Sequence, residues 1–341
     1  PVRQTCYYKM TRVIVILIYS FSMIYCQDKV ATSAANFLGI PMGSKAMSLG
    51  GSYSSMTADA SSIFYNPGSI SRSEKNHFTL NNTDWFFDSK IIFIAGTYKI
   101  NNTLTLGSYI TNLDYGKEEI TDFENQDGTG TYWSANDFAT GATLSFNLTN
   151  SFSIGGTLKY ITQRIHNEKA SSIATDIGLL FSSDVNNFNM GFSISNFGLN
   201  MMLEGKDLYQ KIDLDPEAGG NNETIVAKIK TEYWPLPLFL RIGMSKLFQI
   251  NQKSNTTFTT DFIIPSDDAE ILSNGIELTL YDIFFLRIGH STTFNDFDDE
   301  YISAGFGLKT SIGKSPVRVD YSFQNRNILG SISSLGISFL F

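Results

Sequence analysis

The segment Ser-Pro-Val-Arg-Val-Asp-Tyr-Ser-Phe, residues 315–323, decides the fold. Its apolar side chains fall on every second position, and charged or small residues lie between them. The apolar set is Val317, Val319, Tyr321 and Phe323, and the other set is Arg318, Asp320 and Ser322. A period of two is that of a β-strand whose two faces meet different environments. The same alternation recurs in 187–197 and 236–246, so we expect an all-β chain.

The length of the alternating runs separates two β architectures. A soluble sandwich gives the same alternation as a membrane barrel, so periodicity alone does not decide between them. Ordinary strands have about five or six residues, whereas tilted transmembrane strands have about nine to eleven. Most of the runs here have ten residues or more. We expect fourteen strands at 76–87, 90–100, 103–113, 133–148, 151–163, 171–183, 187–197, 236–248, 254–264, 270–281, 283–293, 300–312, 315–325 and 330–341.

The connections between these runs alternate in size from the second strand onward, as short periplasmic turns and longer external loops do in outer-membrane barrels. The sequence therefore predicts a transmembrane antiparallel β-barrel of about 14 strands, located in a bacterial outer membrane, over residues 76–341. The short connections are Asn101-Asn102, Thr149-Asn150, 184–186, 249–253, Asp282 and Gly313-Lys314. The others, mostly longer, are 114–132, 164–170, 198–235, 265–269, 294–299 and 326–329.

The chain ends in Leu-Gly-Ile-Ser-Phe-Leu-Phe, an alternating strand with a terminal aromatic residue. Phe339 and Phe341 resemble the C-terminal signal that the barrel assembly machinery reads. We expect that machinery and outer-membrane lipid to be partners of this chain.

The N-terminal region has the character of a signal peptide. The apolar run 13–24 follows Met10 and is about half as long as a transmembrane helix, which needs about 20 residues. We expect residues 1–26 to form the signal peptide, with the true start at Met10. Cleavage after Cys26 removes both cysteines, Cys6 and Cys26, so the mature chain has no disulfide and no thiolate metal site. The net charge of -8 argues against binding to nucleic acid.

Nine charged residues fall on the face of the strands that is not apolar. Five are basic and four acidic, so we interpret them as partners in a salt-bridged barrel interior. Alternatively, some of them line a polar path. They are Lys159, Asp176, Arg241, Asp261, Glu277, Arg287, Lys309, Arg318 and Asp320.

Residues 27–75 differ from the rest of the chain, because the part 31–72 has small residues and several glycines but no strand alternation. Such a compact, weakly polar element is typical of a plug or hatch inside a barrel wide enough to hold it. Asp59 is placed to cap a short helix over 60–65, which Asn66-Pro67-Gly68 would end. The motif residues are Gly43, Ala46, Met47, Gly50, Gly51, Asp59, Tyr65, Asn66, Pro67 and Gly68.

This motif, within residues 39–70, resembles the N-terminal signature of the PorV/PorQ proteins, relatives of the FadL-type fourteen-stranded channels. Members usually have Ala in place of Gly68 followed by Gly, and this chain instead has Gly68-Ser69-Ile70, which leaves the subfamily open. The resemblance implies a type IX secretion accessory whose external loops bind the translocon or the C-terminal domains of secreted cargo. The alternative that it implies is a FadL-like channel for hydrophobic molecules with an N-terminal hatch.

No pattern of catalytic residues is evident, so we expect no enzyme activity and no cofactor. The three histidines, His77, His166 and His290, lie far apart and lack metal-ligand spacing. The acidic loop 295–300 could hold Ca²⁺ or simply be solvated. The long acidic loop 204–223 is our choice for contact with a partner.

Overall fold

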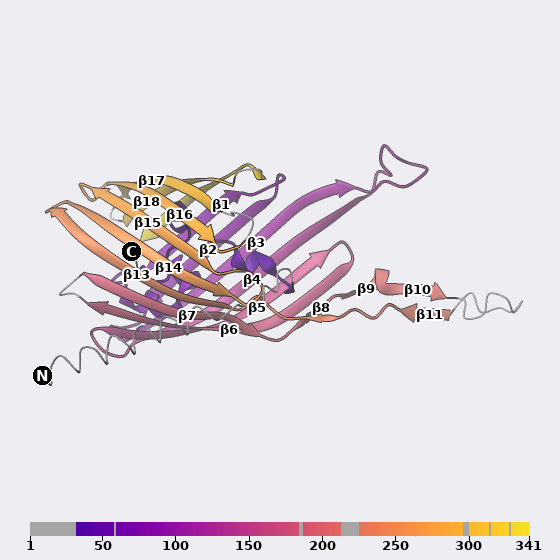
Figure 1. Ribbon diagram of the computed structural model, residues 1–341, viewed down its shortest axis with the longest axis horizontal. Helices are drawn as coiled ribbons and strands as arrows, with labels where there is room; N and C mark the ends of the chain where they lie inside the picture. The colour runs from indigo at the N-terminus through magenta and orange to yellow at the C-terminus, as the bar shows by residue number, and fades with distance from the viewer. Residues whose placement is uncertain are drawn as a thin grey trace, which may run out of the picture.

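A computed structural model describes residues 32–57, 59–183, 187–212, 225–295, 300–313, 315–326 and 329–341 (Figure 1). Fourteen antiparallel strands close into a barrel, as the alternating runs predict. The expected signal peptide, residues 1–26, lies outside the described residues, as does most of the acidic loop 295–300. The barrel strands are β1 His77–Asp84, β2 Lys90–Lys99, β3 Leu104–Glu119, β4 Tyr132–Asn147, β5 Phe152–Ile165, β6 Glu168–Ser183, β7 Phe188–Gly198, β13 Phe239–Asn251, β14 Ser254–Pro265, β15 Ile271–Leu280, β16 Phe284–Thr293, β17 Glu300–Ile312, β18 Ser315–Asn325 and β19 Ser331–Leu340.

The barrel closes where its first and last strands pair. His77 lies opposite Leu340, and the register continues to Asp84 opposite Ser333. Phe78 and Phe339 lie side by side on the outer face, with ring centroids 6.3 Å apart. Phe341 exchanges backbone hydrogen bonds with Asn76. The last strand is therefore fixed to the first along the whole length of β1.

Successive connections lie at opposite ends of the barrel, which we call the short-turn end and the long-loop end (Figure 1). Two expected loops were too long. Strands β3 and β4 extend into 114–132, and β5 and β6 leave a turn of only two residues, Asn167 and His166, in place of the loop 164–170. At the end of β3 and the start of β4 both faces are exposed or half-exposed, so the alternation fades there.

The loop between β7 and β13 carries a β-ribbon of its own, which extends beyond the barrel at the long-loop end (Figure 1). Its inner part is anchored, because Glu168 and Lys169 of β6 pair with β9. Its outer strands, β10 and β11, are exposed along almost their whole length. The elements are β8 Met201–Met202, β9 Glu204–Gly205, η3 Lys206–Leu208, β10 Tyr209–Ile212, β11 Ile225–Lys228 and β12 Tyr233–Trp234.

The two faces of the barrel wall differ as the alternation predicts. Outward side chains are mostly large and apolar, such as Leu158, Ile288 and Phe306, which are more than half exposed. Inward residues are mostly hydroxyl-bearing, charged or glycine, and they are buried. Among the described residues, no helix is of the length and apolar character that crossing a membrane would require.

The inside of the barrel is filled by residues 32–57 and 59–76, which we call the plug. It contains η1 Asn36–Gly39, α2 Ser44–Ser48, α3 Ser62–Tyr65 and η2 Pro67–Arg72. Helix α2 contacts β16 to β19, whereas η2 contacts β3 to β6 on the other side of the barrel. The chain therefore runs from wall to wall, and Arg72 ends it by bonding the carbonyls of Thr149 and Asn150 at the short-turn end.

Candidate functional site

The plug touches the barrel wall through glycines. A side chain on Gly178 of β6 or on Gly191 of β7 would collide with Asn66 or with the backbone of Ser54. On the plug side, a Cβ on Gly68 would lie 2.7 Å from the Gly178 carbonyl. Glycine permits backbones to approach at distances that a Cβ would block. The glycines thus leave room for the plug backbone to lie directly on the wall.

Similar contacts continue around the barrel. A Cβ on Gly275 would lie 2.8 Å from the Cβ of Leu49, and one on Gly305 would lie 2.5 Å from the Cβ of Ser48. Gly50 has a φ of +70° and lies against the backbone of His290. The close fit is thus made on strands from both halves of the sequence.

One side of the plug is held by apolar contacts. Phe64 of α3 packs edge-on against Phe93 of β2 and Tyr109 of β3, with ring centroids 6.2 and 6.1 Å apart. Ile63 and Ile70 are buried in the same cluster. Burying large apolar groups is the main favourable contribution to folding. This half of the interior therefore resembles the core of a soluble protein.

The opposite side is held by charges. Six alternating cations and anions form a chain of ion pairs that we call the charge ladder. It begins at Lys45 of the plug, runs along the inner face of strands β15 to β18, and returns to Asp59 of the plug. Its successive contacts are Lys45 Nζ to Glu277 Oε2 (3.4 Å), Glu277 Oε2 to Arg287 Nε (2.6 Å), Arg287 Nη1 to Asp320 Oδ1 (2.7 Å), Asp320 Oδ2 to Arg318 Nε (2.7 Å), and Arg318 Nη2 to Asp59 Oδ2 (2.6 Å).

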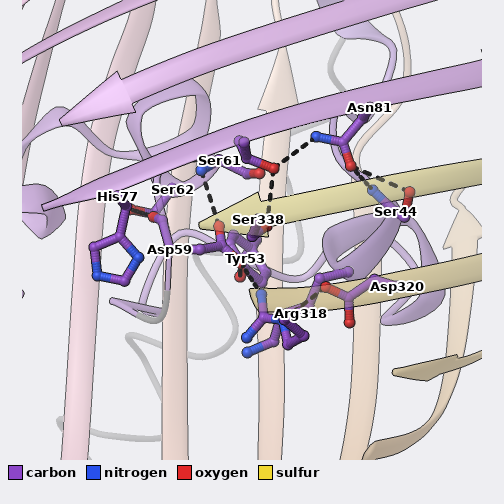
Figure 2. A network of polar contacts seen from close by, with 12 residues as sticks. Ser44, Tyr53, Asp59, Ser61, Ser62, His77, Asn81, Arg318, Asp320 and Ser338 are labelled. Carbon is purple, nitrogen blue, oxygen red and sulfur yellow. Dashed lines mark hydrogen bonds and ion pairs between the residues drawn. The ribbon is translucent and has the colours of Figure 1, made fainter. Parts of the chain in front are cut away.

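Asp59 is one of the two plug residues at the ends of the ladder (Figure 2). Arg318 extends from β18 toward it, and the Tyr53 hydroxyl donates to the same carboxylate oxygen at 2.9 Å. The expected helix cap was wrong in detail, because α3 begins at Ser62 and its N-cap residue, Ser61, makes no side-chain bond there. The second oxygen of Asp59 accepts from the Ser61 backbone at 2.8 Å. Its carboxylate thus orders the turn before the helix and binds the wall.

Two further side chains hold the plug backbone. Asp261, on β14, accepts from the backbone N–H groups of Tyr53 (3.0 Å) and Ser54 (2.8 Å). Asn66, in the plug, donates to the carbonyls of Ser54 (2.8 Å) and Leu179 (2.9 Å). Buried polar groups need such partners, because an unmade hydrogen bond costs about 1–3 kcal/mol.

The other motif residues are also buried in the plug. Gly43 and Gly51 have φ of +90° and +85°, in the left-handed region that favours glycine. The Tyr65 hydroxyl bonds both the N–H (2.8 Å) and the carbonyl (3.0 Å) of Met42. The Met47 carbonyl accepts from Gln324 of β18 at 2.8 Å. Ala46 is fully enclosed, and Pro67 follows Asn66 as the first residue of η2.

The remaining predicted interior charges lie apart from the ladder. Lys159 and Asp176 pair at 2.7 Å, next to a bulge in β7 where Asn196 has a φ of +67°. Arg241 is buried and donates to Ser195 at 3.2 Å. Among the described residues, Arg241, Asp261 and Lys309 belong to no ion pair. Arg241 and Asp261 are instead held by hydrogen bonds, whereas the side chain of Lys309 makes no contact of either kind within the described part of the chain.

Two cavities flank the beginning of the plug at the long-loop end. The first, which we call the mouth cavity, has a volume of about 380 Å³. Its apolar lining is mainly Ile40, Trp85, Phe86, Phe239, Ile271 and Leu329, and Asn36, Asp267, Asp268 and Arg326 complete it with polar groups. The second, the side cavity, has about 480 Å³ and lies against the β7 bulge, where Asn196, Phe197 and Gly198 line it.

Residues 33–41, which we call the cap, lie between these two cavities. Ser33 lines the side cavity, and Asn36 and Ile40 line the mouth cavity. The hydrogen bonds of the cap to the barrel run from the Ala34 N–H to the Pro235 carbonyl (2.8 Å), from the Ala35 N–H to Gln163 Oε1 (2.9 Å) and from the Ser33 side chain to Asp267. Phe37 and Leu38 of the cap are buried, and none of the ion pairs of the charge ladder involves the cap.

Several residues of the barrel interior were not predicted from the sequence. Lys45 lies in a short run of small residues with no strand period, so nothing marked it as an interior charge. The inward Ile91 and Phe93 had a signal, because 91–95 is apolar at every position and not at every second one. A barrel strand that is apolar on both faces indicates that an apolar segment packs against its inner face. No group of described His, Cys, Asp or Glu side chains is arranged to hold a metal ion.

No protein-family model matches the chain, and neither does the sequence of any curated protein. Solved structures do resemble it. They include the CymD monoaromatic hydrocarbon channel (10% identity, TM-score 0.55, 87% of this chain and 96% of that one) and the Pseudomonas putida toluene transporter TodX (11%, 0.55, 88% and 96%). A Pseudomonas aeruginosa FadL homologue is also similar (13%, 0.50, 92% and 98%). The chain thus has the fold of these FadL-like channels and transporters.

Proposed function

We propose that this chain is a non-enzymatic barrel of the bacterial outer membrane that admits small hydrophobic molecules through its long-loop end. The mouth cavity carries the proposal, because it presents apolar and aromatic side chains at the outer end of the plug. A cavity of this size and lining suits a small apolar ligand. The similarity to hydrocarbon channels supports the same class of substrate.

The position of the cap suggests the route. Displacing the cap would join the mouth cavity to the side cavity, which ends at the β7 bulge, where a passenger could leave sideways. The body of the plug can stay in place during this movement. Opening the cap would break its three hydrogen bonds to the described part of the barrel and uncover Phe37 and Leu38, but it would leave every ion pair of the charge ladder in place.

A reversible crosslink tests this route. The Ser33 and Asp267 side chains touch, so the double variant Ser33→Cys, Asp267→Cys should form a disulfide that locks the cap. Uptake of radiolabelled toluene should fall on oxidation and recover with a reductant. Ser33→Cys alone is the control and should respond to neither treatment. If the oxidised double variant takes up toluene at the unlocked rate, cap movement is not part of transport.

A second candidate is the PorV-type role in type IX secretion, and the ribbon favours it. Strands β10 and β11 form an exposed two-stranded ribbon with outward Ile212, Ile225 and Val226. A ribbon of two strands is marginally stable by itself, so a protein partner would stabilise it. The translocon or a cargo C-terminal domain would be that partner. If the chain has this role, deleting residues 206–229 should abolish the surface display of secreted proteins. Toluene uptake should remain unchanged in the same variant.

A further inference from the structure

A third cavity lies at the short-turn end of the barrel, beneath the plug. We call it the inner vestibule; it has a volume of about 360 Å³, large enough for a small ligand. It is separate from the mouth and side cavities, which lie at the opposite end and share no lining residue with it. Its lining includes Lys45, Thr257, Glu277, Thr279, Asp282, Phe285, Lys309 and Arg318.

The charges that line the inner vestibule are unbalanced at one position. Lys309 of β17 lies directly opposite Arg318 of β18 in the register, and both side chains are on the inner face. Like charges in directly opposite positions destabilise a sheet. Arg318 is compensated by Asp59 and Asp320. Lys309 pairs with no acidic group among the described residues, although it is half-buried.

Lys45, on the plug, is also incompletely satisfied. Its only carboxylate partner within the described part of the chain is Glu277, at 3.4 Å, the longest contact of the charge ladder. Glu277 at the same time binds Arg287 at 2.6 Å through the same oxygen. Three cations, Lys45, Lys309 and Arg318, thus face a cavity in which the acidic lining consists of Glu277 and Asp282.

Neutral hydrogen-bonding groups complete the lining. Thr257 and Thr279 are more than nine-tenths buried, and both line the cavity. Phe285 adds an aromatic face, over which Arg287 and Arg318 lie 5.5 and 5.7 Å from the ring centroid. The cavity therefore offers positive charge, threonine side chains and an aromatic surface.

We propose that the inner vestibule binds a small molecule with a carboxylate or phosphate group, whose oxygens meet Lys309 and whose remainder lies toward Phe285. This goes beyond the proposed transport of hydrocarbons, which carry no charge. The bound oxyanion also approaches Lys45 and Arg318, so it competes with Glu277 and Asp59 for the cations that hold the plug. Occupancy of the vestibule therefore weakens the charge ladder at both of its plug ends.

Titration calorimetry on the purified full barrel in non-ionic detergent at low ionic strength tests the site, with inorganic phosphate and hexanoate as probes. We expect saturable binding of at least one probe by the wild-type protein. Lys309→Met should weaken it at least about tenfold, the loss expected for one charge-assisted hydrogen bond. Lys309→Arg should retain binding. Phosphate binding without hexanoate binding indicates a phosphate ligand, and the reverse indicates an amphiphilic acid.

The matched control is Lys246→Met, which removes an equal charge from the outer face of β13, where Lys246 lies over Phe248. It should bind the probes as the wild type does. A heat-dependent shift on a gel confirms that each variant is folded. No saturable binding of either probe to the wild type, or an equal loss in Lys246→Met and Lys309→Met, would overturn the proposal.

Discussion

Arg287 and Asp320 form an ion pair, with Nη1 and Oδ1 2.7 Å apart, although they lie on strands that are not neighbours. Strand β17 runs between β16 and β18, and Gly307 occupies the position beneath the pair. A Cβ there would lie 2.5 Å from Asp320 Oδ1 and 3.1 Å from Arg287 Nη2. The missing side chain lets the charge ladder cross a strand.

We expect Gly307→Ala to destabilise the barrel by about 3 kcal/mol, because it separates two buried charges that have no room to move apart. Unfolding in urea, followed by the gel mobility shift, measures the change. Gly96→Ala is the control: the nearest atoms to its Cβ would be 3.9 Å away, so it should be neutral within about 0.5 kcal/mol. Equal stability of the two variants would show that the crossing at Gly307 is dispensable.

Asp59→Asn removes the charge at the plug end of the ladder while keeping the shape of the side chain. Arg318 then keeps Asp320 alone, and we expect a loss of about 3 kcal/mol in the free energy of unfolding. The exposed pair between Glu204 and Lys228 is the comparison, and Glu204→Gln should cost less than about 1 kcal/mol. Comparable losses in the two variants would contradict the anchoring role of Asp59.

Asn66→Ala should loosen the plug without opening the wall. It leaves the Ser54 and Leu179 carbonyls and the Gly68 N–H without their side-chain partner, a loss of about 2–4 kcal/mol. Hydrogen exchange should become faster in the plug amides and remain slow in β14 to β18. Asn125→Ala, in an exposed loop, is the control. Uniformly faster exchange over the strands would mean that Asn66 stabilises the whole barrel.

The membrane location makes a separate prediction. Ile288 is 53% exposed at the middle of β16, where the outer face would meet hydrocarbon. Ile288→Arg should cost about 2–4 kcal/mol there and reduce assembly into the outer membrane. Ile283→Arg, in the adjacent short turn, should assemble normally. A wild-type protein that stays soluble without detergent would contradict the membrane location itself.

The sequence predicted the wall better than the interior. Alternation of Val317, Val319 and Tyr321 with charged residues is local, so the strands could be found one by one. The partners of Arg318 could not, because they depend on which strands meet around the barrel and on where the plug lies. The small residues of 31–72 predicted a compact element, but nothing local marked Lys45 and Asp59 as the two ends of one ladder.

The apolar contacts around Phe64 also could not be predicted from the alternation of residues in the strands. Phe93 and Tyr109 are large side chains on the inner face, and their presence there is explained by Phe64 of the plug, which packs against both of them. The alternation assigns each residue to the inner or the outer face, but it does not show which part of the chain packs against the inner face. Here that part is the plug, which is distant in sequence and has one apolar and one charged side.

The glycine contacts have a consequence for biogenesis. The plug lies against strands from both halves of the barrel with no space for a side chain between them, so it cannot be threaded into a finished cylinder. We therefore expect the seam between β1 and β19 to close only after the N-terminal segment has been placed against the other strands.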